Sequence, residues 1–208
     1  MPVFVFLLGI AAGGSAAEPR GNALTLYAAY RDGGSFTDIT TDNDLPIEAS
    51  SAGAVSLDLR LDANRQLQLY VSHQNSRVDA RRATQPTPPV GPLPAKFPLA
   101  VTYAHIGGTV FFNKHNVEEG GYLVGGLGVT LFQPDLDGLA NELRPSVNLG
   151  IGYQFPFGED LALRIEARGY ATFVNSSSAL FCSGGCVVFV SSDTVTQGEV
   201  QLGLSYRY

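Results

Sequence analysis

The chain has 208 residues, of which 45% are hydrophobic and only 15% are charged. Charged residues make up about a quarter of an average soluble domain, so their share here is low for such a domain. The net charge of −6 and the pI near 4.9 argue against a nucleic-acid-binding protein, which would carry a basic surface. No stretch in the body of the chain approaches the ~20 continuous apolar residues of a membrane-spanning helix.

Residues 1–17 have the outline of a secretory signal peptide. Residues 3–12 form a short apolar core, and residues 15–17 supply the small side chains that precede a cleavage site. The basic residues that normally come first are missing, which leaves open a translation start farther upstream. The alternative is a buried N-terminal helix or strand. We expect a mature chain from about Glu18, with residues 18–208 forming one domain.

Alternation of apolar and polar residues predicts eight β-strands, because successive side chains of a strand point to opposite faces. The pattern is clearest at residues 54–62, and a turn at 62–65 joins this strand to the next as a hairpin. Gly107 and Gly108 interrupt the alternation of the fourth strand and predict a bulge. The expected strands span residues 22–31, 54–62, 66–74, 99–113, 121–132, 146–155, 161–173 and 197–208.

Long and short connections alternate along most of the chain. The long ones are residues 32–51, 77–98 and 175–196, and six prolines in 77–98 argue against a strand ladder there. Tight turns at one end and long loops at the other are typical of outer-membrane barrels. In lipid every backbone N–H and C=O must be paired, so the strands must close on themselves. We therefore predict an all-β fold, an eight-stranded antiparallel up-and-down transmembrane β-barrel with a polar lumen.

The charged residues of the strands lie on the face opposite the leucines. Pointed into lipid, each basic group would cost about 2–4 kcal/mol near the midplane, whereas in a confined lumen charges can pair. Aromatic residues near the strand ends are typical of interfacial girdles. Those expected in the girdles are Tyr30, Tyr103, Phe111, Phe112, Tyr122, Phe132, Tyr153, Phe155, Phe173, Tyr206 and Tyr208. The alternative is a soluble, lipocalin-like barrel or sandwich, in which the leucines form the core and the charges meet water. The predicted lumen charge network is Arg31, Asp58, Arg60, Asp62, Arg164, Glu166, Arg168, Glu199 and Arg207.

The last strand ends the chain on an aromatic residue. Its apolar face consists of Val200, Leu202, Leu204, Tyr206 and Tyr208. A long half-apolar strand at a chain terminus leaves a free edge in an open sheet, but in a barrel it pairs with the first strand.

Several segments resemble those of small proteobacterial outer-membrane β-barrel proteins of the opacity and OmpA-like transmembrane type, often labelled porin-family proteins. The matching segments are TLYAAYRDGGSF, LDLRLDANRQLQLYVSHQ, YAHIGGTVFF, YLVGGLGVTLFQP and the ending QGEVQLGLSYRY. The resemblance implies an integral location in the bacterial outer membrane. It also implies that the apolar face of the last strand is the signal read by the barrel-assembly machinery, although Phe is commoner there than Tyr208.

The residues that could carry chemistry are few. Cys182 and Cys186 lie in the last long loop of an exported chain, which favours a disulfide over a metal site without further ligands. Ser72 and His73 are adjacent, but no nucleophile-elbow motif occurs, so we expect no enzyme and no catalytic residues. The acidic residues of the first loop lack the spacing of a calcium site, so we expect a solvated loop, no metal and no cofactor.

Three functions remain open at this stage. The first is a structural and surface-interaction barrel with long extracellular loops and a plugged lumen, because side chains fill the interior of eight-stranded barrels. The second is a narrow channel for small or hydrophobic solutes, and the third is an outer-membrane lipid-modifying enzyme. The expected partners are outer-membrane lipids, the barrel-assembly machinery and an extracellular ligand at the loops, for a protein that is a monomer and binds no nucleic acid.

Overall fold

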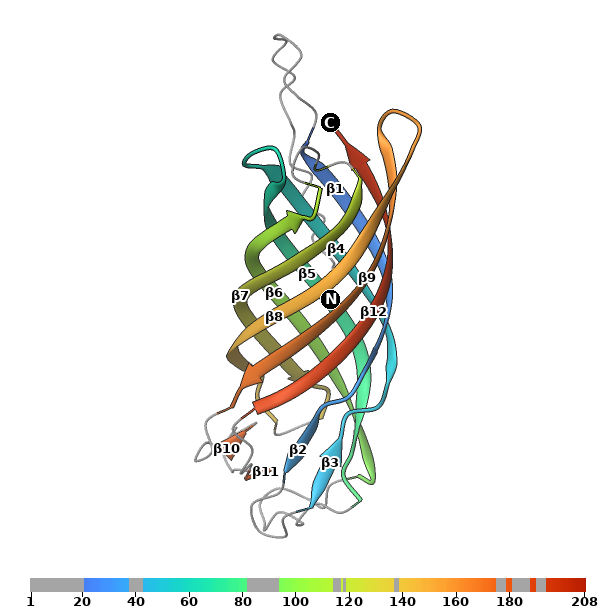
Figure 1. Ribbon diagram of the computed structural model, residues 1–208. Coiled ribbons are helices and arrows are strands. Elements are labelled where there is room, and N and C mark those ends of the chain that lie inside the picture. Colours follow the sequence, from blue (N-terminus) through green and yellow to red (C-terminus); the bar gives the residue numbers. More distant parts are fainter. Residues whose placement is uncertain are drawn as a thin grey trace, which may run out of the picture.

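The structure is a computed structural model, and it describes residues 21–37, 43–81, 94–113, 117, 119–136, 139–174, 179–180, 188–189 and 194–208. A closed antiparallel barrel dominates it (Figure 1). The barrel strands are β1 (Ala23–Asp32), β4 (Ser50–Arg60), β5 (Arg65–Asp79), β6 (Lys96–Phe111), β7 (Gly120–Pro134), β8 (Glu142–Phe157), β9 (Leu161–Phe173) and β12 (Thr194–Arg207). Each pairs with its neighbours in the chain, and β12 closes the barrel on β1 from Ala23↔Arg207 to Asp32↔Gly198. The predicted eight-stranded up-and-down barrel is confirmed.

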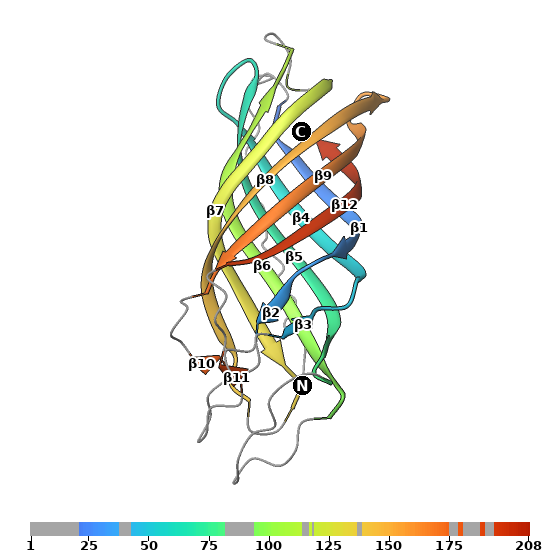
Figure 2. The same cartoon turned by 60° about the horizontal axis from the view of Figure 1, so that its bottom comes forward.

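Two small antiparallel sheets lie at one end of the barrel. They are β2 (Ser35–Thr37) with β3 (Asp44–Pro46), and β10 (Ala179–Leu180) with β11 (Val188–Phe189). We call this the loop end, because the longer connections meet there, and the opposite end the turn end. Figure 2 brings the loop end forward and shows β2 and β3 continuing from β1 and β4. None of the described residues form a helix long and apolar enough to cross a membrane.

Two expectations about the strands were wrong. Residues 77–98 are not loop throughout, since β5 and β6 continue to pair through Arg77↔Pro98 and Asp79↔Lys96. A proline near the end of a strand removes only one donor from the ladder, so Pro98 is tolerated. Gly107 and Gly108 form no bulge, because the pairing runs without interruption through Gly107↔Gly126 and Gly108↔Gly125.

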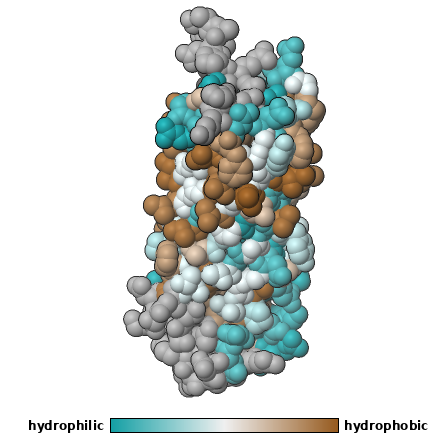
Figure 3. Space-filling model, in the orientation of Figure 1, coloured by the Kyte–Doolittle hydropathy of each residue, from teal (hydrophilic) through white to brown (hydrophobic). Residues whose placement is uncertain are grey.

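The barrel carries its apolar side chains on the outside. Leu26, Leu149 and Val200 are each more than 60% exposed, whereas Arg31 on β1 and Glu199 on β12 are buried. Figure 3 shows the result as a band of brown, apolar residues between teal, polar ends. This polarity is the reverse of a soluble barrel, so the soluble alternative is excluded. A surface of this kind is stable only where hydrocarbon covers it.

The aromatic residues divide between the two faces. Tyr153, Phe155, Tyr206 and Tyr208 are exposed near the turn end, as expected of a girdle. Tyr103, Phe111, Tyr122 and Phe132, which we also expected in a girdle, are instead buried inside the barrel. The continuous register of β6 and β7 places these four on the inward face.

Candidate functional site: the barrel interior

An ion pair between β1 and β12 lies inside the barrel on the loop-end side. The Arg31 guanidinium donates from Nε and Nη2 to Glu199 Oε2, at 2.9 and 2.6 Å. It also donates to the Ser72 hydroxyl on β5. Both charged side chains are fully buried, so each depends on the other for compensation of its charge.

Two tyrosines complete the surroundings of Glu199. The hydroxyls of Tyr70 and Tyr170 donate to Glu199 Oε1 at 2.9 and 2.8 Å. The ring of Tyr170 stacks on that of Tyr103 with 4.1 Å between centroids, and the Arg31 guanidinium lies 4.8 Å from the Tyr103 centroid. Both carboxylate oxygens are thus used, and the cation rests on aromatic faces as well as on its counter-ion.

A second ion pair joins two residues of β9. Arg168 Nε donates to Glu166 Oε1 at 2.7 Å, and its guanidinium lies 3.8 Å from the Tyr70 ring centroid. Glu166 also accepts from Gln201 Nε2 at 2.6 Å and from the Tyr122 hydroxyl at 2.9 Å. The Tyr70 hydroxyl also lies 3.1 Å from Gln201 Oε1, so this pair is continuous with the Arg31–Glu199 pair.

The third ion pair lies towards the turn end. Arg164 Nη1 donates to Asp58 Oδ2 at 2.7 Å, and its Nε donates to Gln154 Oε1 at 2.6 Å. Asp58 also accepts from the Ser56 hydroxyl at 2.8 Å and, through Oδ1, from Gln68 Nε2 at 2.8 Å. Gln68 in turn accepts from Arg168 at 3.0 Å, which links this pair to the second one.

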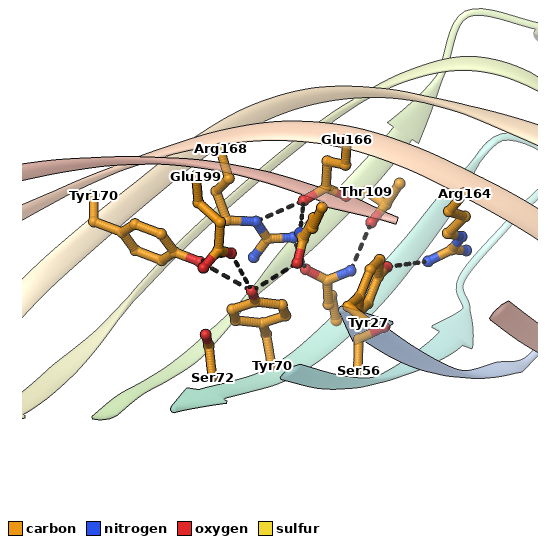
Figure 4. A network of polar contacts seen from close by, with 12 residues as sticks. Tyr27, Ser56, Tyr70, Ser72, Thr109, Arg164, Glu166, Arg168, Tyr170 and Glu199 are labelled. Carbon is orange, nitrogen blue, oxygen red and sulfur yellow. Dashed lines mark hydrogen bonds and ion pairs between the residues drawn. The ribbon is translucent and has the colours of Figure 1, made fainter. Parts of the chain in front are cut away.

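The three pairs form one hydrogen-bonded system, which we call the lumen network. Figure 4 shows its middle part, with Tyr70 and Tyr170 beside Glu199 and with Arg168 beside Glu166. Three arginines face three carboxylates, so these six groups carry no net charge. Residues from β1, β4, β5, β7, β8, β9 and β12 take part, and the network therefore ties together walls that are not neighbours in the sheet. Its charged members are Arg31, Asp58, Arg164, Glu166, Arg168 and Glu199.

The other three residues of the predicted network lie at the turn end. Arg60, the last residue of β4, donates from Nε to the Asp62 carbonyl at 3.1 Å. The prediction that Asp62 belongs to the lumen charge network is wrong, because this residue faces the turn. Its carboxylate accepts from Arg65 Nε at 2.6 Å and from the backbone N–H groups of Asn64 and Arg65. Arg207 is buried but donates to carbonyls of the β8–β9 turn, among them that of Glu159 at 2.9 Å.

The turn around Asp62 offers a prediction about pH. The hydrogen bond from the Arg65 side chain, together with the Asn64 and Arg65 backbone N–H groups, lowers the pKa of Asp62 below its ordinary value. A lowered pKa in the folded state stabilises the turn above the unfolded pKa of about 4, and this contribution disappears as the pH falls through the folded value. We expect Arg65→Met to raise the pKa of Asp62, as read from its carboxyl carbon by NMR titration. An unchanged titration curve would contradict the assignment.

The inward tyrosines and glutamines of the lumen network were not singled out from the sequence. A signal was present, because they share the odd–even position of the charges: Tyr170 follows Arg164, Glu166 and Arg168 at intervals of two. Their partners could not be found in this way, since the contacts cross the lumen to strands far away in the sequence.

An apolar layer lies between the lumen network and the loop end of the barrel. Phe36 and Leu45 from β2 and β3, with Ile47 just after β3, pack against inward side chains of the barrel, and the rings of Phe36 and Phe132 meet edge to face at 5.5 Å. Gly33 and Gly34 have φ of 86° and 91°, a conformation that favours glycine, and they turn the chain from β1 into β2. The barrel residues of this apolar layer are Val78, Phe97, Leu99, Val101, Phe132, Val174 and Val195.

Solved structures of known proteins share this architecture. The chain is similar to Neisserial surface protein A, with a TM-score of 0.56 and 13% identity over 92% of this chain and 100% of that one. It is also similar to the outer membrane protein AlkL, with a TM-score of 0.52 and 12% identity over 97% of each chain. For OprG from Pseudomonas aeruginosa the TM-score is 0.50, with 11% identity over 90% of this chain and 96% of that one. This is the fold of the small outer-membrane barrels. No family model matches the sequence, and no curated protein matches it.

In this outer-membrane-type barrel the apolar face of the last strand looks outward. Val200, Leu202, Leu204, Tyr206 and Tyr208 are all exposed on the outer wall, and the rings of the two tyrosines stack at 6.3 Å. This face is therefore accessible on the finished barrel. Its role as an assembly signal remains a prediction.

The histidines do not assemble a catalytic triad within the described residues. Ser72 and His73 point to opposite faces, Ser72 towards Arg31 and His73 outward, where its Nδ1 lies 2.8 Å from the Thr102 hydroxyl. Sequence reasoning missed a different pair, His105 Nε2 and the Ser146 hydroxyl, which lie 3.0 Å apart inside the barrel. No described residue pairs with His105 Nδ1, so the imidazole lacks the acidic group that would orient it as a base.

Several predictions fall outside the described residues. They are the signal peptide at 1–17 and the disulfide between Cys182 and Cys186. Asp38 and Asp42, two of the acidic residues of the first long loop, and His115, after the fourth expected strand, lie outside as well. Within the described part of the chain, no three His, Cys, Asp or Glu side chains are grouped closely enough to hold a metal ion.

Proposed function

We propose that the protein is an integral outer-membrane barrel whose lumen is closed and whose function is to present its long loops at the cell surface. The observation that carries this proposal is that two successive groups of side chains fill the interior of the barrel. The lumen network occupies the middle of the barrel, and the apolar layer covers it at the loop end. Eight strands enclose an interior that side chains can fill, so a path for ions would require several buried groups to move together.

The proposed location rests on the outer surface. The exposed apolar belt requires hydrocarbon around it, and the fold is that of solved outer-membrane proteins. We place the loop end outside the cell and the turn end in the periplasm, because such barrels have long loops outside. The name of Neisserial surface protein A fits a role at the surface for a barrel of this architecture.

The partners in this proposal are lipids around the belt, the barrel-assembly machinery during insertion and an extracellular ligand at the loops. The barrel closes within one chain, which supports a monomer. We propose no enzymatic activity and no cofactor, because the Ser146–His105 pair is enclosed and lacks a third group. An altered lipid A profile in a deletion strain would contradict this part of the proposal.

Conductance in a planar bilayer tests the closed lumen. We expect no steady conductance from the wild-type barrel, because three neutralised ion pairs and an apolar layer leave ions no hydrated path. The single variants Phe36→Ser and Arg168→Ala should also stay closed, since each leaves the other barrier in place. The double variant should conduct more than either.

The channel hypothesis gives a different pattern in the same measurement. A narrow channel for small solutes would conduct steadily as wild type, and Arg168→Ala would change or abolish that conductance. A channel for hydrophobic solutes is tested by the uptake of an apolar solute into vesicles that contain the wild-type barrel, compared with the uptake into vesicles without protein. Either result in the wild-type protein would overturn the closed lumen.

A further inference from the structure

A hollow of about 860 Å³ lies on the outer wall of the barrel, within the apolar belt. Strand pairing places its lining in two rows that cross β7, β8, β9, β12 and β1. One row is Leu123, Ile151, Ala167, Val200 and Tyr30, and the next towards the loop end is Leu149, Gly169, Gly198 and Asp32. The small residues are Ala167 in the first row and Gly169 and Gly198 in the second. Most of the residues on either side of them are large.

The hollow continues towards the loop end. A second hollow of about 420 Å³ shares Leu149 and Gly169 with the first and adds Val147, Ala171 and Thr196. Together they form a trough with a floor of alanine and glycine along β9 and β12. Its walls are the aliphatic side chains of β8 on one side, and Tyr30 and Val200 on the other. In Figure 3, whose front face carries β8, β9 and β12, pale residues interrupt the brown belt.

The glycines of the floor are not needed for close packing of the backbone. A Cβ on Gly198 would meet no atom within 4 Å, and one on Gly169 would meet only the Leu149 carbonyl at 3.8 Å. Neither glycine has a positive φ. A side chain could therefore stand at both positions, and the trough exists because none does.

We propose that the trough binds one acyl chain of a membrane lipid. It opens on the surface that lipid must cover, and a void there would forfeit dispersion contacts on its whole lining. Lipid tails and leucines are equally apolar, so the gain is contact and not the hydrophobic effect. A chain in the trough touches floor and both walls, whereas a chain on the smooth belt touches one side only.

The polarity along the trough matches that of a lipid. Leu123 and Ile151 line the end nearer the turns, whereas Asp32, Gly33 and Thr196 line the end nearer the loops. An amphiphile with its tail towards the bilayer centre and its headgroup towards the loops satisfies both ends. This inference rests on the proposed membrane location, but not on the closed lumen.

Native mass spectrometry of the full chain, extracted from membranes in mild detergent, tests the proposal. We expect the wild-type barrel to retain one lipid, and the double variant Gly169→Leu/Gly198→Leu to retain it at least about tenfold less, because the leucines fill the floor. Gly53→Leu is the matched control, since Gly53 lies on the outer wall of β4 with no atom nearer than 4.0 Å to an added Cβ. It should retain the lipid.

Three results would overturn the acyl-chain site. They are a wild-type barrel without lipid, equal retention by the double variant, and an occupant whose mass is a second barrel or a solute. Heat-dependent gel mobility of each variant shows that it has folded, so loss of the lipid cannot be confused with loss of the barrel. Conductance of the same samples reports on the closed lumen separately, so either proposal can fail without the other.

Discussion

Replacing Arg164 with methionine is expected to lower the free energy of unfolding by about 3–5 kcal/mol, which is the usual consequence of removing one partner of a buried ion pair. The Asp58 carboxylate would stay buried with the Ser56 hydroxyl and the Gln68 amide as donors but with no counter-ion. Gln154 would also lose the donor at 2.6 Å. Urea unfolding of the barrel in lipid vesicles, followed by gel mobility without heating, measures the change.

The double variant Asp58→Leu/Arg164→Met separates charge from packing. Removing both charges leaves no uncompensated ion, so we expect it to recover most of the loss. Some loss should remain, because Gln154 loses the hydrogen bond from Arg164 and Gln68 loses the hydrogen bond to Asp58. Arg65→Met is the matched control, since it breaks an exposed pair in the turn and should change the unfolding far less than Arg164→Met does. An Arg164→Met barrel as stable as the wild type would show that the third ion pair carries little of the stability.

The strands and their polarity could be predicted because both depend on local order in the sequence. Residues 54–62 alternate apolar and polar side chains, and β4 has this alternation with Asp58 inside. The same reasoning placed Arg31, Arg164, Glu166, Arg168 and Glu199 on the face that the structure buries. The odd or even position of a residue along a strand, here called its parity, is thus sufficient to assign its side chain to the lumen or to the lipid face where the alternation is unbroken.

Parity does not report position along the barrel axis. Asp62 shares the parity of Asp58, but the strand has ended by then and the carboxylate accepts from its own turn. The apolar layer has the opposite difficulty: Phe97, Leu99 and Val101 have inward parity on a strand whose facing was uncertain around its two glycines. Their partners Phe36 and Leu45 come from a loop, and only the closed barrel brings the two groups together.

The sequence pattern also does not show which of several arginines pairs with a given carboxylate. The sequence pairs no arginine with a particular carboxylate, and the parity of Glu199 would suit Arg168, its neighbour across β9 and β12, as well as Arg31. In the structure Glu199 takes Arg31, while Arg168 turns to Glu166 in its own strand. In this arrangement Tyr70 and Tyr170 occupy the other oxygen of Glu199.

Gly107→Ala is expected to lower the free energy of unfolding by about 1–3 kcal/mol, the range found when extra atoms are forced into a packed interior. A Cβ at this position would lie 1.9 Å from the Gly125 carbonyl oxygen and 2.5 Å from the Gly126 Cα, both backbone atoms of β7. Backbone cannot rotate away as a side chain can. The contact can be relieved only if β6 and β7 separate, which weakens pairing in a barrel that has no free edge to absorb the shift.

Gly198→Ala makes the comparison sharp, because it adds the same methyl group where no atom lies within 4 Å. Restricting the unfolded chain at a position without strain stabilises a protein by about 0.4–1 kcal/mol, so the control should change stability in the opposite direction. Urea unfolding in vesicles and the temperature at which the compact gel band disappears measure both variants. Equal stability of Gly107→Ala and the wild type would mean that β6 and β7 do not approach each other as closely as the four facing glycines, Gly107, Gly108, Gly125 and Gly126, indicate.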